Sequence, residues 1–160
     1  MYDLLLSFCK WLQNSPLGLA VGGTLWGYPF VQLVHFFGLS LWVGTIAMLD
    51  LRLLGIAGRT QGIAEFSEQL FPWTWTGLCI VLAGGLMLFS AAAASYLDNP
   101  AFQIKFPLVL TGIAVHIVIL MKVPQWDRSP SIPPMAKIAG LLELSLWLGV
   151  ITAAVMIPNF

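Results

Sequence analysis

Apolar positions in this chain form long stretches, and the charged positions fall into short groups between them. No charged residue occurs at positions 11–49, 69–97 or 106–121, and none follows Glu143. A helix needs roughly 20 apolar residues to cross the hydrocarbon core of a bilayer. The pattern predicts an all-α fold, an integral membrane four-helix bundle in one membrane domain over residues 1–160. We expect its transmembrane helices at about 28–50, 71–96, 104–122 and 138–158.

The N-terminal segment lacks the pattern of a signal peptide. Asp3 stands where such a peptide would carry basic residues, and the stretch 10–14 interrupts the apolar run. We therefore expect an interfacial helix over about 2–13, lying along the membrane surface. The pair Ser15-Pro16 predicts the start of a second, short helix over about 16–25.

Prolines and capping residues indicate where the spans begin. Pro29, Pro72 and Pro100 lie near the expected starts of the first three spans, where proline costs no helical hydrogen bond. Asp98 or Asn99 is the candidate N-cap of the third span. The connection after that span, "VPQWDRSPSIPP", contains four prolines, and we expect it to be stiff and extended.

Small residues predict how the spans pack. Gly77, Gly84 and Ala91 recur at seven-residue spacing in the second span. Small side chains allow membrane helices to approach closely. We interpret this row as a packing seam, and its glycines lie within apolar helices, unlike those of a phosphate-binding loop.

The composition excludes several classes of protein. Hydrophobic residues make up 59% of the chain and charged residues only 9%, which excludes a soluble globular fold. Seven basic and seven acidic residues leave no basic face for nucleic acid. Two isolated cysteines exclude a disulfide scaffold, a zinc ribbon and an iron–sulfur site. We therefore expect the lipid bilayer, and no nucleic acid, as a partner.

The basic residues predict the orientation in the membrane. The first and third connections hold five of them, namely Arg52, Arg59, Lys122, Arg128 and Lys137. The N-terminal segment and the second connection hold two, Lys10 and Lys105. Because basic residues favour the cytoplasmic side, we expect both termini outside. In a bacterium this describes a multi-pass inner-membrane protein with periplasmic termini.

The chain has two histidines, His35 and His116, and both fall within predicted spans. Each has a glycine about one turn away, Gly38 and Gly112 respectively. On facing helices, His35 would come level with Gly112, and His116 with Gly38. A haem b between the first and third spans would use this arrangement, with one imidazole on each face of the iron and the glycines making room for the ring.

Two other interpretations of the histidines stay open. Each imidazole could instead pack on the opposite glycine and hydrogen-bond to a carbonyl or hydroxyl group. Another metal is the third interpretation, with copper as the alternative cofactor. Trp42 lies seven residues after His35, on the same face, where it would line a haem edge or fill the core.

Glu143 lies within the fourth span, and Asp50 and Arg52 lie at the cytoplasmic end of the first. A lone carboxylate in lipid takes up a proton or finds a cation. We expect an ion pair between Glu143 and Arg52 that ties the first and fourth spans together. The alternative is a carboxylate that handles protons or other ions.

The stretch "YPFVQLVHFFGLSLWVGTIAMLDLRLLG", together with "FPWTWTG", "NPAFQIK" and "LSLWLGVI", carries a resemblance over nearly the whole chain. It resembles a family of small bacterial four-span membrane proteins known only as a domain of unknown function. It is also distantly similar to the membrane domain of copper-resistance protein D. The family resemblance implies signature positions at His35, Asp50, Arg52, Pro72 and Trp73, and it implies no reaction.

Three functions follow as expectations. The first is a b-type cytochrome-like subunit that transfers electrons to or from a membrane or periplasmic protein partner. The second is a copper-handling membrane protein. The third is an accessory or assembly subunit of a larger complex, without a cofactor of its own. None of these three functions requires the protein to be an enzyme on its own. Each is compatible with an oligomer of this chain or with a subunit of a larger complex.

Overall fold

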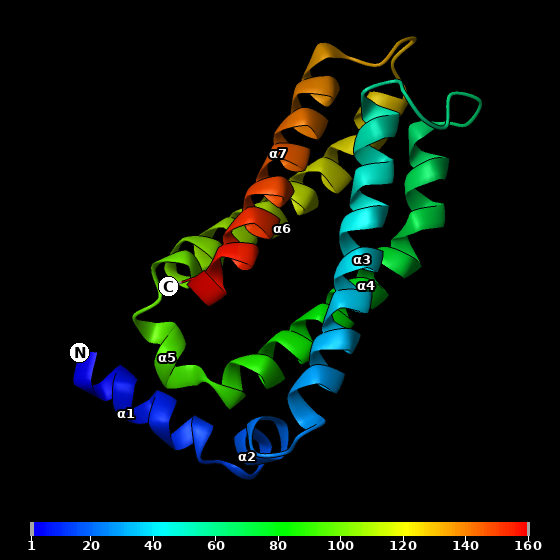
Figure 1. The fold of residues 1–160 in the computed structure, drawn as a ribbon. Coiled ribbons are helices and arrows are strands. Elements are labelled where there is room, and N and C mark those ends of the chain that lie inside the picture. Colours follow the sequence, from blue (N-terminus) through cyan, green and yellow to red (C-terminus); the bar gives the residue numbers. More distant parts are fainter. Residues whose placement is uncertain (1, 160) are drawn as a thin grey trace.

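The structure is a computed structural model, and it describes residues 2–159 (Figure 1). Within this range the fold is all-α, as the sequence predicts. The helices, in chain order, are α1 (Tyr2–Gln13), α2 (Pro16–Gly22), α3 (Gly27–Leu53), α4 (Ile63–Ala91), α5 (Ala93–Leu97), α6 (Pro100–Asp127) and α7 (Pro134–Met156), followed by the short 3₁₀ helix η1 (Ile157–Asn159). Four segments are long and apolar enough to cross a membrane: α3, α4, α6 and the stretch Pro134–Asn159.

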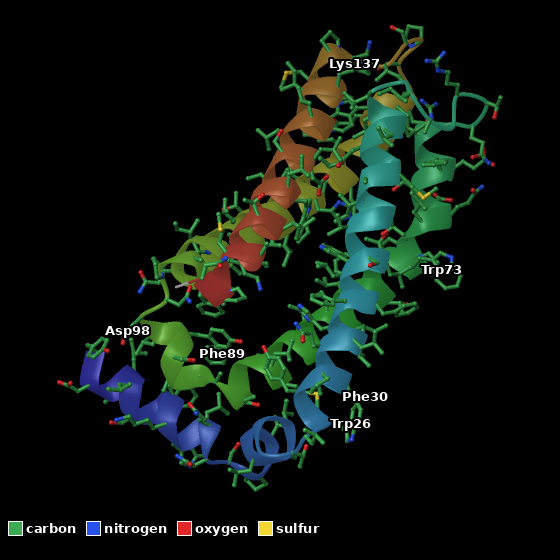
Figure 2. The ribbon with its side chains drawn as sticks, viewed as in Figure 1. Trp26, Phe30, Trp73, Phe89, Asp98 and Lys137 are labelled. Carbon is green, nitrogen blue, oxygen red and sulfur yellow. The ribbon has the colours of Figure 1, made fainter. Side chains whose placement is uncertain are left out.

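The four long helices form two antiparallel pairs, α3 with α4 and α6 with α7. Figure 1 shows the two pairs close together at the end that holds the α3–α4 and α6–α7 connections, and farther apart at the other end. There α1, α2 and α5 lie across the opening. Lys137 and Asp98 mark these opposite ends (Figure 2).

The α3–α4 contact is built on the predicted seam of small residues. A Cβ on Gly77 would lie 2.6 Å from the backbone nitrogen of Trp42, and one on Gly84 would lie 2.9 Å from the Cβ of His35. The third member of the seam, Ala91, lies against Gly22 of α2. The seam is therefore confirmed, and it fixes how α3 is turned toward α4.

Two apolar clusters fill the bundle. The one nearer the connections contains Leu49, Leu53, Ile63, Phe66, Ile119, Val123 and Ala136. The second contains Trp42, Ile46, Leu78, Trp147 and Val150. Asp127 at the end of α6 accepts a hydrogen bond from the backbone N–H of Ile63, which caps the first turn of α4 and joins the two pairs.

The start of α4 differs from the sequence-based expectation. The helix begins at Ile63, eight residues before the expected position, so Pro72 lies within it. The charge-free stretch of this span begins only after Glu68. A helix can nevertheless begin outside the lipid, with its charged residues in water. Proline removes one backbone hydrogen bond, and α4 is bent where Trp73 lies (Figure 2).

Other boundaries also differ, and both α6 and α7 begin four residues before their expected starts, at Pro100 and Pro134. α4 ends at Ala91, and a separate short helix, α5, replaces the expected last turn of the second span. α6 continues through Pro124 to Asp127, so the first five of the twelve residues in the connection expected to be extended are helical. The short helix α2 ends at Gly22. By contrast, α1 matches its expected range, and the side chain of Asn99 caps α6 by accepting from Phe102 N.

Candidate functional site

A close pair of ionisable groups inside the bundle joins α6 to α7. Nδ1 of His116 lies 3.0 Å from Oε1 of Glu143, and the two side chains are 2% and 0% exposed. Trp147, one turn after Glu143, directs its indole N–H toward the same oxygen at 3.5 Å. A buried carboxylate without such partners would be strongly destabilising, so this contact explains how Glu143 is accommodated.

The hairpin geometry brings these two residues to one depth. His116 lies 11 residues before the end of α6, and Glu143 lies nine residues after the start of α7. Because the connection between the helices is short, equal distances from it along antiparallel helices correspond to equal depths. The similar spacing of His116 and Glu143 from the connection can be read from the sequence. It is informative only when the helix ends are known, and the charge pattern places those ends incorrectly.

Asp50 of α3 is the third ionisable member of the cluster. Its side chain is fully buried, and its carboxyl group lies beside that of Glu143. The close approach of α7 to α3 depends on Gly140, where a Cβ would lie 3.1 Å from the carbonyl oxygen of Asp50. Three helices therefore bring two carboxyl groups and one imidazole together away from water.

Tryptophan rings surround the cluster on the side toward the open end. The ring of Trp42 meets that of His116 edge to face at 5.4 Å and that of Trp147 at 5.7 Å. Trp75 of α4 lies 6.4 Å from Trp42. Trp42 therefore belongs to the apolar core, and its ring limits the space around the imidazole.

The other ring nitrogen of His116 points away from Glu143. Nε2 is buried and has no hydrogen-bond partner within residues 2–159. His116 also lines a small cavity of about 10 Å³ between α3, α4 and α6. Imidazole can carry a proton on either nitrogen, so His116 is placed to connect the carboxyl groups with this cavity.

Arg52 does not make the expected ion pair. Its guanidinium group donates to the backbone carbonyl of Gln61 in the α3–α4 connection. Among the described residues, the partner of Glu143 is His116 instead. Arg52 follows Asp50 by two positions in a helix, so the two side chains point in different directions.

The structure does not bring His35 and His116 together. Nδ1 of His35 lies 2.9 Å from the carbonyl oxygen of Val81, so this histidine faces α4. Gly38 also faces α4, at Ile80 and Val81. His35 lies within the α3–α4 contact, and His116 lies within the α6–α7 contact.

Gly112 faces α7 rather than α3, and a Cβ there would lie 3.1 Å from the ring of Trp147. The two glycines therefore serve helix packing on separate sides of the bundle. No group of three or more His, Cys, Asp or Glu side chains in residues 2–159 could hold a metal ion.

Comparison with known proteins identifies a family but no characterised relative. The model of the Family of unknown function (DUF6644) matches residues 8–158. No curated protein and no solved structure matches the chain. The match includes all four long helices and each member of the buried cluster.

Proposed function

The chain belongs to the DUF6644 family of unknown function, and we propose that it is a multi-pass membrane protein that binds and transfers protons at the cluster of Asp50, Glu143 and His116. One observation carries the proposal. An imidazole and a carboxyl group lie 3.0 Å apart, almost completely buried, within helices that can cross a membrane. Ionisable groups at such positions are costly and commonly form proton relays.

The number of protons in the cluster supports this function. The cluster is neutral when both carboxyl groups are protonated and the imidazole is uncharged. It is also neutral when Asp50 keeps its proton, Glu143 is a carboxylate and His116 is an imidazolium. These two states differ only in the position of one proton along the Oε1–Nδ1 contact. A low-dielectric interior disfavours net charge, and exchange between these states leaves the net charge of the cluster unchanged.

A haem b ligated by both histidines does not fit these contacts. His35 is hydrogen-bonded to α4, and Trp42 and Glu143 enclose the ring of His116. Moving either histidine to a shared iron would break the α3–α4 seam or leave Glu143 buried without its partner. We therefore derive no step through haem.

Copper handling, suggested by the likeness to copper-resistance protein D, is also not favoured by the cluster. Copper sites commonly combine sulfur with imidazole, whereas the neighbours of His116 supply carboxyl oxygens and indole rings. The orientation implied by the basic residues remains part of our proposal. It places both termini outside a bacterial inner membrane, and the proton cluster toward the cytoplasmic half.

Proton flux into liposomes tests this function. The purified protein would be reconstituted with a pH-sensitive dye inside the vesicles and an imposed potential across the membrane. We expect wild-type protein to increase the rate of acidification, and Glu143→Gln and His116→Asn to abolish the increase. Glu68→Gln is the matched control, because Glu68 is an exposed carboxylate on α4.

Correct folding of each variant would be verified by size-exclusion chromatography before reconstitution. Equal flux in wild-type protein and both cluster variants would contradict the proposal. So would the absence of flux in folded wild-type protein, which would favour an accessory subunit that acts only within a larger complex.

A further inference from the structure

The small cavity beside His116 has the size and the polar groups of a binding site. About 10 Å³ of it is open to the centre of a water molecule, which is near the minimum that one water needs. Ser67, Thr74 and Trp75 of α4 line one side of it, and Thr45 of α3 and His116 of α6 line the others. Three of the four long helices therefore meet at this cavity.

Residues that line the cavity carry buried ring nitrogens without hydrogen-bond partners. Nε1 of Trp75 and Nε2 of His116 are both buried, and neither meets a hydrogen-bond partner in the part of the chain that the structure describes. Indole N–H is a donor only. In both neutral states of the cluster, Nε2 of His116 also carries a hydrogen, because Nδ1 faces Glu143. Two donors therefore lack acceptors, and each would cost free energy if left unpaired.

The hydroxyl groups at the same cavity supply the complementary acceptors. Thr74 donates its hydrogen to the carbonyl oxygen of Leu70, and Thr45 donates to that of Leu41. Their oxygens can then only accept from the cavity, while the hydroxyl of Ser67 can donate or accept. A ligand for this site must offer two lone pairs and at least one hydrogen within the volume of a single water.

We propose that one water molecule binds in this cavity, accepting from His116 Nε2–H and Trp75 Nε1–H and donating to the hydroxyl oxygens of α4. This inference rests on the proposed proton transfer and extends it by naming the group on the far side of the imidazole. From the imidazolium state, the Nε2–H bond breaks and its proton passes to the water oxygen, which forms hydronium. His116 is left neutral with its remaining proton on Nδ1, facing the Glu143 carboxylate. The reverse step returns this proton from the hydronium to Nε2 and restores the imidazolium.

Solid-state NMR on the full chain in lipid vesicles tests the water site. The chain has two histidines, so labelling histidine with ¹⁵N gives two sets of ring signals, which His35→Asn assigns. We expect rapid transfer of magnetisation from water to Nε2 of His116. Ser67→Val, which fills the cavity, and Trp75→Phe, which removes a donor, should each abolish that transfer.

Ser145→Val is the control, because Ser145 is an exposed residue of α7 whose hydroxyl donates to the carbonyl oxygen of Leu141. It should leave the transfer unchanged. Absence of transfer in wild-type protein, or the same transfer in wild-type protein and both cavity variants, would overturn the proposal. If the transfer is found but the liposomes show no proton flux, the water site stands and the proposed function fails.

Discussion

Glu143 of α7 faces His116 of α6 across a contact of 3.0 Å, with almost no exposed surface on either side chain. Asp50 of α3 lies beside this pair. Three of the four long helices, α3, α6 and α7, thus share one buried ionisable cluster. Its stability and its capacity to exchange a proton should depend on the same contacts.

The first prediction concerns the energetic coupling of the pair. Replacing His116 with Phe leaves Glu143 buried without its partner, and we expect a loss of about 3–5 kcal/mol in the free energy of unfolding. The double variant His116→Phe with Glu143→Leu should be less destabilised than His116→Phe alone, because it removes the unpaired carboxyl group. Denaturant unfolding in detergent gives the values for a double-mutant cycle. Additive losses would show that the two side chains do not interact.

The second prediction concerns the approach of α7 to α3. Gly140→Ala places a methyl group 3.1 Å from the carbonyl oxygen of Asp50, so α7 must move away. We expect a loss of about 1–3 kcal/mol from overpacking and weaker proton flux, since Asp50 and Glu143 are separated. Gly149→Ala is the control, because its methyl group would lie at an ordinary 3.7 Å from Leu108. A thermal melt in which the two variants are equally stable would refute this account of Gly140.

The third prediction concerns the seam between α3 and α4. A methyl group at Gly77 would lie 2.6 Å from the backbone of Trp42, whereas one at Gly44 would meet nothing within 4 Å. Gly77→Ala should therefore lower the melting temperature. Gly44→Ala should raise it slightly, because alanine is favoured over glycine in helices by about 1 kcal/mol. If both substitutions raised the melting temperature, the close packing at Gly77 would be wrong.

The fourth prediction concerns the docking of α1 at alkaline pH. The hydroxyl group of Tyr2 donates to both carboxylate oxygens of Asp98, at 3.0 and 2.9 Å. This hydrogen bond raises the pKa of Tyr2 above its usual value of 10.0. A raised pKa means that the contact stabilises the fold while Tyr2 is protonated and is lost as the pH rises through that pKa.

We therefore expect α1 to separate from α5 above about pH 10, which a loss of amide hydrogen-exchange protection over residues 2–13 would report. Tyr2→Phe should lack this alkaline transition and should dock more weakly at neutral pH. An alkaline transition of the same size in Tyr2→Phe would contradict the assignment.

The charge pattern predicts the four spans because charges are costly in lipid, and this constraint holds for each helix separately. It does not determine helix ends in water, so the early start of α4 at Ile63 and the extension of α6 to Asp127 were not predicted. The charge pattern also does not determine which side of each helix faces which neighbouring helix.

For this reason the sequence identifies His35, His116, Asp50 and Glu143 as buried polar residues but pairs them incorrectly. The rotation of α3 is set by the close approach of Trp42 to Gly77, which turns His35 toward α4. The short α6–α7 connection is the better guide, since it brings His116 and Glu143 to one depth once the helix ends are known.

Infrared difference spectroscopy tests most directly whether Glu143 exchanges a proton. Spectra of the protein in lipid would be recorded across a pH titration, for wild type and for Glu143→Gln. We expect a carboxylic acid C=O band that changes with pH in wild-type protein and is absent in the variant. His116→Asn should retain a band for Glu143 but shift its titration, because the imidazole no longer accepts the proton. Identical titration spectra for wild type and Glu143→Gln would show that Glu143 does not change its protonation, and would contradict the proposed function.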